Sequence, residues 1–410
     1  MSPFRLCASA AAAVLLPVLA TAAPLTLDRA LERAVQRSEA ARSARSGVTR
    51  ASEAARAAGQ LPDPMLGASL ENLPITGPDR LHTGRESMTM KRLALSQEWV
   101  SAEKRALRTA AAGAAVSREA AAVAAVAADT RLQTAMAYVD AFYASAALKL
   151  SAENEARARE AADTARARLS AGAGMAQEVL ALMSTGGMAA DETAEVRQQM
   201  AAAAVTLARW TGTTADDLSS PSLNAPVSEQ AFVDRHPMVV AKRRDIEVAR
   251  QEAAVTASNR RPNLTWEVAY SQRSNFSDMV SLGVSIPLPV APAARQDRET
   301  ASKLALVDKN EAELAEAVRS AQAEYQAVTS DATRLQQRIA AFESNVLTSA
   351  RQRTAAATAA YGSNQTALSM VFEARQAELE ARRKLLNLQR DLAKALAQLN
   401  FKPLRAEELQ

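Results

Sequence analysis

Cysteine is nearly absent from this sequence, because Cys7 is the only one among 410 residues. With no second cysteine the chain forms no internal disulfide, and it offers no cysteine cluster for a metal. Cys7 also precedes the first apolar run, whereas a cysteine that carries a lipid anchor has to follow such a run. We therefore expect neither disulfide nor lipid-anchor chemistry.

Aromatic residues, glycine, proline and histidine are also scarce. Aromatics make up 4% of the chain, beside 13 glycines and 15 prolines, which fits long helices better than compact globular domains. The two histidines, His82 and His236, are far apart, and the short G-x-G at Gly172 and Gly174 follows a predicted helix rather than a strand. Neither a nucleophile relay nor a phosphate-binding loop can be assembled from these residues. We predict that the protein is not an enzyme and has no cofactor.

Long apolar runs are missing after the N-terminal region. Residues 1–22 contain Arg5, the run ASAAAAVLLPVLA and the small-residue ending Ala-Thr-Ala, which is the pattern of a secretory signal peptide cleaved after Ala22. Beyond it no segment has about 18 consecutive apolar residues, so any membrane span has to be a β-strand. The sequence thus predicts an exported protein whose membrane contact, if any, is made by strands.

Clustered charge of one sign is also lacking, although the formal net charge is +4. Arginine and glutamate are interleaved, as in NEARAREAADTARAR (154–168), which is typical of a solvated helix face. A nucleic-acid site would instead need basic clusters with stacking aromatic residues. We expect no nucleic-acid partner.

The sequence contains an internal duplication. Pro64, in PDPMLGASLENL (62–73), matches Pro262, in RRPNLTWEVAYS (260–271), and similar helical segments precede both. Each repeat has the predicted order helix, strand, loop, strand, very long helix, turn, helix. The predicted boundaries follow in chain order: repeat one at 23–211, a linker at 212–227, repeat two at 228–400 and a C-terminal tail at 401–410.

Each repeat contains a predicted β-hairpin, at about 65–99 and about 263–289. In the second hairpin, Leu264, Trp266, Val268 and Tyr270 alternate with polar or small residues, and a similar alternation runs from Val280 to Leu288. Strands of about nine or ten residues have the length that crosses a bilayer when tilted. The alternative, a soluble β-sandwich, would need many more strands than four.

Four strands are too few to close a membrane barrel, and an open sheet edge in lipid leaves backbone groups unpaired. The chain is therefore expected to oligomerise. Two copies would supply about eight strands, whose barrel interior is filled by side chains, and three would supply about twelve, enough for a pore. We predict a homotrimer in contact with membrane lipid.

The long helix explains most of the remaining chain. No proline occurs between Ala102 and Ala171, and roughly 70 helical residues would extend on the order of 100 Å. Small side chains in AAAGAAVSREAAAVAAVAA (110–128) allow helix axes to approach closely in a wall of parallel helices. The predicted fold class is mainly α with membrane β: a trimeric 12-stranded barrel, four strands per chain, continued by a long α-helical tunnel.

These features together resemble the TolC-like outer-membrane efflux proteins. The resemblance rests on the duplicated unit, on PDPML and RRPNL at the strand entries, and on LSQEW (95–99) and VSIPL (284–288) at the strand exits. The phrases PDPML, ENLPITGPD and MTMKRLALSQEW look most like the branch that serves heavy-metal efflux pumps of the resistance-nodulation-division type.

The resemblance implies a trimeric exit duct with its barrel in the outer membrane and its helical tunnel in the periplasm. The partners it implies are a periplasmic adaptor (membrane fusion protein) and an inner-membrane pump that supplies the energy. Heavy-metal cations are then the expected substrates, with organic compounds or drugs as an alternative. A second alternative is a periplasmic coiled-coil adaptor, which would carry one helical hairpin and lack two membrane-length β-hairpins.

The resemblance also places the adaptor contact at the two turns between long helices, RLSAGAGMAQEVL (168–180) and AYGSNQTALSMVF (360–372). The candidates for this contact are Arg168, Leu169, Gly172 and Gly362, although both glycines can equally be simple helix C-caps.

Acidic residues just after such turns line the closed entrance in relatives, which makes Glu178 and Glu373 the gate candidates. Glu178 is six residues after Gly172, but the residue six after Gly362 is Leu368. This departure leaves a solvated surface role as the alternative for both glutamates.

No metal site is predicted. His82, Met88 and Met90 are the nearest approach to a set of soft ligands, and they form no cluster of the kind that Cu(I) requires. His236 precedes a proline at a predicted helix start, and we interpret it as structural.

Overall fold

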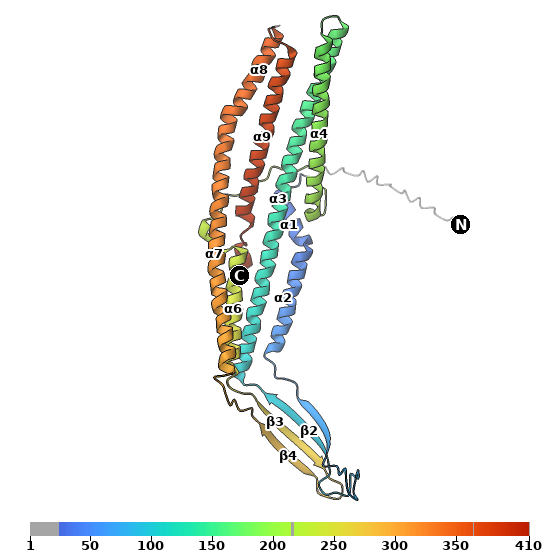
Figure 1. Ribbon diagram of the computed structural model, residues 1–410, viewed down its shortest axis with the longest axis vertical. Helices are drawn as coiled ribbons and strands as arrows, with labels where there is room; N and C mark the ends of the chain where they lie inside the picture. The colour runs from blue at the N-terminus through green and yellow to red at the C-terminus, as the bar shows by residue number, and fades with distance from the viewer. Residues whose placement is uncertain (1–23, 215–216, 364, 410) are drawn as a thin grey trace, which may run out of the picture.

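The computed structural model describes residues 24–214, 217–363 and 365–409, so the predicted signal peptide lies outside the described residues. The molecule is elongated, with a β-sheet at one end and helices running away from it to two turns at the opposite end (Figure 1). The turn between α3 and α4 and the turn between α8 and α9 both lie at this far end.

The sheet has four antiparallel strands in the order β1-β2-β3-β4. Their bounds are Met65–Glu71, Met90–Trp99, Leu264–Gln272 and Met279–Ser285. The two predicted hairpins are joined through the pairing of β2 with β3, so the two repeats build a single sheet. The prediction of four strands per chain is confirmed.

Strand β4 is shorter than its alternation predicts, because it ends at Ser285 rather than near Leu288. Pro287 and Pro289 follow at once, and proline has no backbone N–H to donate to a strand ladder. The side chains of Ile286 and Leu288 remain exposed beyond the strand.

The first repeat contains α1 (Leu27–Arg37), α2 (Glu39–Ala58), α3 (Ala102–Ser170) and α4 (Ala176–Thr211). Thr26, Ser38 and Ser101 cap the first three, each accepting a hydrogen bond from a backbone N–H of the first turn. Helix α3 has 69 residues, which confirms the predicted long helix and gives it a length of roughly 100 Å.

By length and composition, α3 also contains a stretch that would pass as a membrane span, alone among the described helices. Alanine supplies most of its apolar character, and α2, α4, α6 and α9 all pack against this helix. The stretch is therefore weak evidence for a helical span.

The second repeat contains α5 (Glu229–Asp234), α6 (Pro237–Ser258), α7 (Gln296–Ala341), α8 (Thr348–Gly362) and α9 (Leu368–Phe401). The very long helix expected in this repeat runs without a break from Gln296 to Gly362, and a π-helical segment, Phe342–Leu347, divides it into α7 and α8. Directly after this segment, Thr348 Oγ1 of α8 donates to the carbonyl oxygen of Glu343, five residues earlier. Such a π-turn inserts one extra residue into the helix and locally changes its direction.

The largest buried cluster lies midway along the helices, where α1, α3, α4 and α9 meet. Tyr138 of α3 is fully buried there, and its hydroxyl lies 2.6 Å from the carbonyl oxygen of Leu25 and 2.7 Å from that of Ser219. Most other buried residues of α3 are alanines, which confirms that small side chains let these helices pack closely. Helix α9 contributes Leu388 and Leu399 to the interior.

The C-terminal segment packs back on α3. Leu404 is buried with Ala124, Ala128 and Val240, and its backbone N–H donates to the carbonyl oxygen of Arg235 at 2.8 Å. A short 3₁₀-helix, Ala406–Leu409, follows it. The predicted tail thus belongs to the packed structure as far as it is described.

Candidate functional site

One face of the sheet, which we call the apolar sheet face, exposes a continuous set of large apolar side chains. Its rows run across all four strands, as in Leu66, Leu95, Val268 and Leu282, which are paired in register. Leu282 is 80% exposed and Leu66 is 71% exposed. Soluble monomers rarely expose so large an apolar patch, so this face needs an apolar environment or a partner. The other members are Leu70, Leu93, Trp266, Tyr270, Val280 and Val284.

The opposite face carries mostly glycine, alanine and serine, together with a cluster of charges around Arg92. Arg92 of β2 forms ion pairs with Glu71 of β1, at 3.3 Å, and with Glu267 of β3. These pairs connect three strands and so help to hold the two repeats in register. This face is suited to contact with water.

Aromatic residues stand near both ends of the apolar sheet face. Trp99 and Trp266 lie close to the helices, while Tyr270 and the exposed Phe276 lie toward the hairpin turns. Trp and Tyr prefer the boundary between hydrocarbon and water. Trp99 was not among the candidates predicted from the sequence, although its place at a strand end was a usable signal.

The outer edges of the sheet, β1 and β4, have no strand partner within the described residues. Their backbone N–H and C=O groups are therefore available for pairing with other chains. Such a sheet can be extended by further strands at both edges.

A polar network joins the sheet to the long helix. Lys104 of α3 is 4% exposed, and its ammonium group donates to the carbonyl oxygen of Arg261 and to Asn263 Oδ1, both at 2.9 Å. Asn263 in turn donates to Glu98 Oε1 of β2 at 2.6 Å. Burial lowers the pKa of Lys104, and the nearby charge of Arg108 lowers it further. Nothing in the sequence distinguishes this lysine from its many neighbours.

At the far end, the turn from α3 to α4 contains the predicted candidates Arg168, Leu169 and Gly172. Gly172 has a φ of +73°, its N–H donates to Leu169 O at 3.0 Å, and the N–H of Ala173 donates to Arg168 O at 2.9 Å. This pair of bonds is a Schellman motif, which requires a left-handed residue at the position of Gly172. The C-cap interpretation of Gly172 is therefore supported.

Gly174 is a second glycine that this turn requires. A Cβ atom at Gly174 would lie 2.9 Å from the backbone nitrogen of Leu169, closer than side chains come in real structures. The chain therefore folds back on the end of α3 at a distance that only glycine permits. In the sequence, Gly174 stands out only through the short G-x-G, which gives no indication of this close approach.

The turn from α8 to α9 does not use Gly362 in the same way. Gly362 is the last residue of α8. The hydrogen bond from Ala173 to Arg168 has its counterpart here in a bond from the N–H of Gln365 to Ala360 O at 2.8 Å. Since α4 begins at Ala176 and α9 at Leu368, the two turns correspond at an offset of 192 residues. The pairing of Gly172 with Gly362 is therefore wrong, and the position that matches Gly172 is 364, which lies outside the described residues.

The same offset revises the acidic candidates. Glu178 corresponds to Met370, not to Leu368, and Glu373 corresponds to Ala181. Val179 and Val371 correspond to each other and are both buried, which supports this register. Glu178 is half-buried and Glu373 is exposed, so the two glutamates occupy different positions in the two repeats.

Arg168 connects the two turns. Its guanidinium group donates to the hydroxyl of Tyr361, and its central carbon lies 5.8 Å from the centroid of the tyrosine ring. At the offset of 192, Tyr361 is the counterpart of Leu169. We call residues 168–180 and 360–372 the helical tip. Tyr361 was not a candidate predicted from the sequence, although tyrosine is rare in this chain.

Beneath these turns the tip has a small apolar core and, outside it, exposed apolar side chains. Ala162, Ala165, Val179 and Leu182 are buried together, with Leu368 and Phe372 packed against them. On the surface, the exposed fractions are 38% for Leu169, 73% for Met175 and 66% for Leu180. The tip therefore has a fixed shape and an apolar surface available to a partner.

The two tip glycines are expected to respond in opposite directions to alanine. Gly172→Ala forces a side chain into a left-handed conformation, which costs about 1–2 kcal/mol and speeds hydrogen exchange of the Ala173 amide roughly 10-fold. Gly362→Ala, at a helical residue with open space around its Cβ position, is neutral or stabilises by up to about 1 kcal/mol. Equal effects of the two substitutions would contradict the assigned register.

The remaining sequence candidates do not meet at one site. Met88 is exposed in the β1–β2 loop, and no group of three or more His, Cys, Asp or Glu side chains is placed to hold a metal within the described residues. His236 is buried as the N-cap residue of α6, with Nε2 at 3.3 Å from Glu324 Oε2. Burial lowers the pKa of His236, against the opposing effect of Glu324. These contacts are consistent with a structural histidine.

Comparisons with known proteins find similarity at the level of structure. No protein-family model matches the sequence, and no curated protein sequence matches it. The outer membrane protein VceC from Vibrio cholerae superposes with a TM-score of 0.73 at 18% identity, covering 92% of this chain and 95% of VceC. The MtrE outer membrane channel of Neisseria gonorrhoeae, in its open state, gives a TM-score of 0.75 at 17% identity, covering 92% of this chain and 88% of MtrE.

CusC, whose structures concern folding and transmembrane channel formation, gives a TM-score of 0.73 at 16% identity. The match covers 92% of this chain and 91% of CusC. These identities are low, and the coverage is almost complete in both directions. The chain therefore has the fold of outer-membrane channel proteins, and the predicted fold class is confirmed.

Proposed function

We propose that this protein is the outer-membrane exit duct of a tripartite efflux pump. The observation that carries the proposal is the apolar sheet face, which lies at one end of a helical body roughly 100 Å long. A lipid bilayer is the environment that such a face fits, with its aromatic residues at the boundaries. The shared fold with VceC, MtrE and CusC supports the same function.

The open edges of β1 and β4 support a homotrimer. In lipid every backbone polar group has to be paired, so strand β4 of one chain pairs with β1 of the next until the barrel closes. Three chains give about twelve strands, with the serine-rich, charged face toward a water-filled pore. The helices of the three chains continue this pore as a periplasmic tunnel.

The helical tip is the proposed contact for a periplasmic adaptor, which connects the duct to an inner-membrane pump of the resistance-nodulation-division type. Exposed Leu169 supplies apolar surface for this contact. The turn around Gly172 and the segment at Gly362 form the end of the helical body that would meet the adaptor. The bond from Arg168 to Tyr361 holds the two turns together and so favours a closed entrance. Glu178 and Glu373 are candidates for a cation-attracting entrance.

Heavy-metal cations are the proposed substrates, because of the resemblance in PDPML, ENLPITGPD and MTMKRLALSQEW. Conduction is passive, since the pump supplies the energy. Organic compounds are the alternative cargo of the same duct. A periplasmic adaptor is the alternative class of protein, and the four-stranded sheet with its apolar face favours the duct.

The test is membrane fractionation followed by native mass spectrometry and conductance in planar bilayers. We expect a detergent-extracted trimer from the outer membrane that forms ion-conducting pores. A soluble monomer, or a protein located in the inner membrane, would overturn the proposal and favour the adaptor.

The adaptor contact has its own prediction. In a strain that supplies the matching pump and adaptor but lacks its own duct, Leu169→Asp is expected to lower metal resistance at least about 10-fold, because a charge on this apolar surface is desolvated on docking. The conservative Leu169→Met should retain resistance. Both variants should still form trimers, and full resistance with Leu169→Asp would remove Leu169 from the contact.

A further inference from the structure

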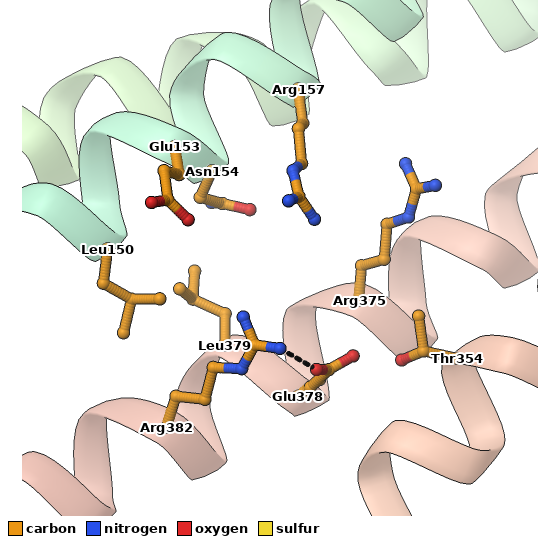
Figure 2. Close-up of a pocket in the computed structure, with 9 residues that line it drawn as sticks. All are labelled: Leu150, Glu153, Asn154, Arg157, Thr354, Arg375, Glu378, Leu379 and Arg382. Atoms are coloured by element: carbon orange, nitrogen blue, oxygen red, sulfur yellow. Dashed lines mark hydrogen bonds and ion pairs between the residues drawn. The ribbon is translucent and has the colours of Figure 1, made fainter.

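A charged cavity lies between α3 on one side and α8 and α9 on the other. Figure 2 shows its polar lining, in which Glu153, Asn154 and Arg157 come from α3 and Arg375, Glu378 and Arg382 come from α9. The two sides belong to different repeats, since α3 pairs with α4 and α8 pairs with α9. A ligand in this cavity would therefore contact both helical hairpins of the chain.

Two of the three arginines lack a carboxylate partner. Arg157 of α3 and Arg375 of α9 reach from opposite sides into the space between the helices (Figure 2), and neither makes an ion pair with any described residue. The guanidinium carbon of Arg375 lies 5.9 Å from the centroid of the Phe372 ring, a contact that orients this side chain. The third, Arg382, is bound to Glu378 at 2.5 Å.

The two carboxylates of the cavity offset only part of the charge of its three arginines. Glu378 is occupied by Arg382 and is largely buried, with 13% of its side chain exposed. Glu153 lies on the α3 side and pairs with neither arginine. Two guanidinium groups that line one cavity without a carboxylate partner favour an anion there, and their planar forks match the oxygens of phosphate or carboxylate. The side-chain amide of Asn154 adds a further donor.

We propose that this cavity binds a small oxyanion with two or more negative charges, such as inorganic phosphate. The anion bridges Arg157 and Arg375 and so links the two hairpins. Arg157 precedes Arg168 by 11 residues on the same helix, which places the site roughly 16 Å from the bond between Arg168 and Tyr361. The site lies roughly 80 Å along α3 from the sheet, which excludes lipid headgroups around the barrel as the source.

The experiment is equilibrium dialysis of the purified full-length protein with radiolabelled phosphate, at constant ionic strength set with sodium chloride. We expect saturable binding, with the affinity reduced at least about 10-fold in Arg157→Gln and in Arg375→Gln, because each substitution removes a charge-assisted hydrogen bond. Arg159→Gln is the matched control, since Arg159 pairs with Glu155 on its own helix at 2.7 Å. Sulfate and succinate should compete, whereas chloride should not.

No saturable binding by the native protein would overturn the proposal. Binding that is equally strong in Arg157→Gln, Arg375→Gln and Arg159→Gln would also overturn it, because the phosphate would then be held by overall charge. Circular dichroism checks that each variant folds, and Arg157→Lys, which keeps the charge but loses the fork, provides a second variant of intermediate affinity. The measurement needs neither membrane nor pump, so its result is independent of whether the chain forms an efflux duct.

Discussion

Leu282→Arg is expected to prevent the assembly of the barrel in the outer membrane. Leu282 lies on the apolar sheet face and is paired with Val268 in the adjacent strand. An arginine on the lipid side near the bilayer midplane costs about 2–4 kcal/mol per chain, and roughly three times as much in a trimer. The fraction of protein recovered as trimer from outer membranes measures the effect.

Ser281→Arg is the matched control for this substitution. Ser281 is the preceding residue in the same strand, is also exposed, and points to the face that carries Arg92 and Glu267. A charge on this side faces water in the proposed pore, so assembly should remain close to that of the native protein. If both variants assembled equally well, the apolar sheet face would not be in contact with lipid.

Glu408→Ala is expected to release the C-terminal segment from α3. Both carboxylate oxygens of Glu408 accept hydrogen bonds from Arg131 at 2.7 Å, and 5% of the Arg131 side chain is exposed. Removing one partner leaves a buried, unpaired guanidinium, which costs about 3–5 kcal/mol. Hydrogen exchange of the Leu404 amide, which donates to Arg235 O, should accelerate roughly 100-fold or more.

Two further variants separate the ion pair from a general effect of the segment. Glu407→Ala changes the adjacent exposed glutamate and should leave exchange at Leu404 unchanged. Replacing Arg131 and Glu408 together with Met and Leu should restore most of the protection, because a packed apolar pair needs no charge compensation. An equal loss of protection in Glu407→Ala and Glu408→Ala would show that Arg131 does not hold the segment.

The same contact predicts a pH dependence. Burial acts to raise the pKa of Glu408, but the hydrogen bonds from Arg131 and from the Arg405 backbone outweigh it, so the pKa lies below the ordinary value. A carboxylate with a lowered pKa in the folded state stabilises that state at all pH values above the unfolded pKa. Protection of Leu404 should therefore be constant at neutral pH and fall only as the solution becomes more acidic than the usual glutamate range. Loss of protection between pH 6 and pH 8 would contradict this assignment.

Both kinds of segment from which the molecule is built could be predicted from local sequence patterns. The alternation from Leu264 to Tyr270 predicted a strand with one apolar face, because the two faces of a strand meet different surroundings. The absence of proline between Ala102 and Ala171 predicted a single helix, and the helix ends at Ser170. Both signals are local, since periodicity and chain breakers act on neighbouring residues.

The tertiary structure alone decided which polar residues matter and how the two repeats correspond. The chain has 49 lysines and arginines and 45 acidic residues, and only folding selects Arg131 with Glu408, or Arg168 with Tyr361, from among them. The offset of 192 residues between corresponding positions of the two tip turns likewise depends on which backbone hydrogen bonds close each turn, and not on where a glycine occurs. Contacts between residues far apart in the sequence depend on how the helices pack, and such contacts leave no periodic pattern in the sequence.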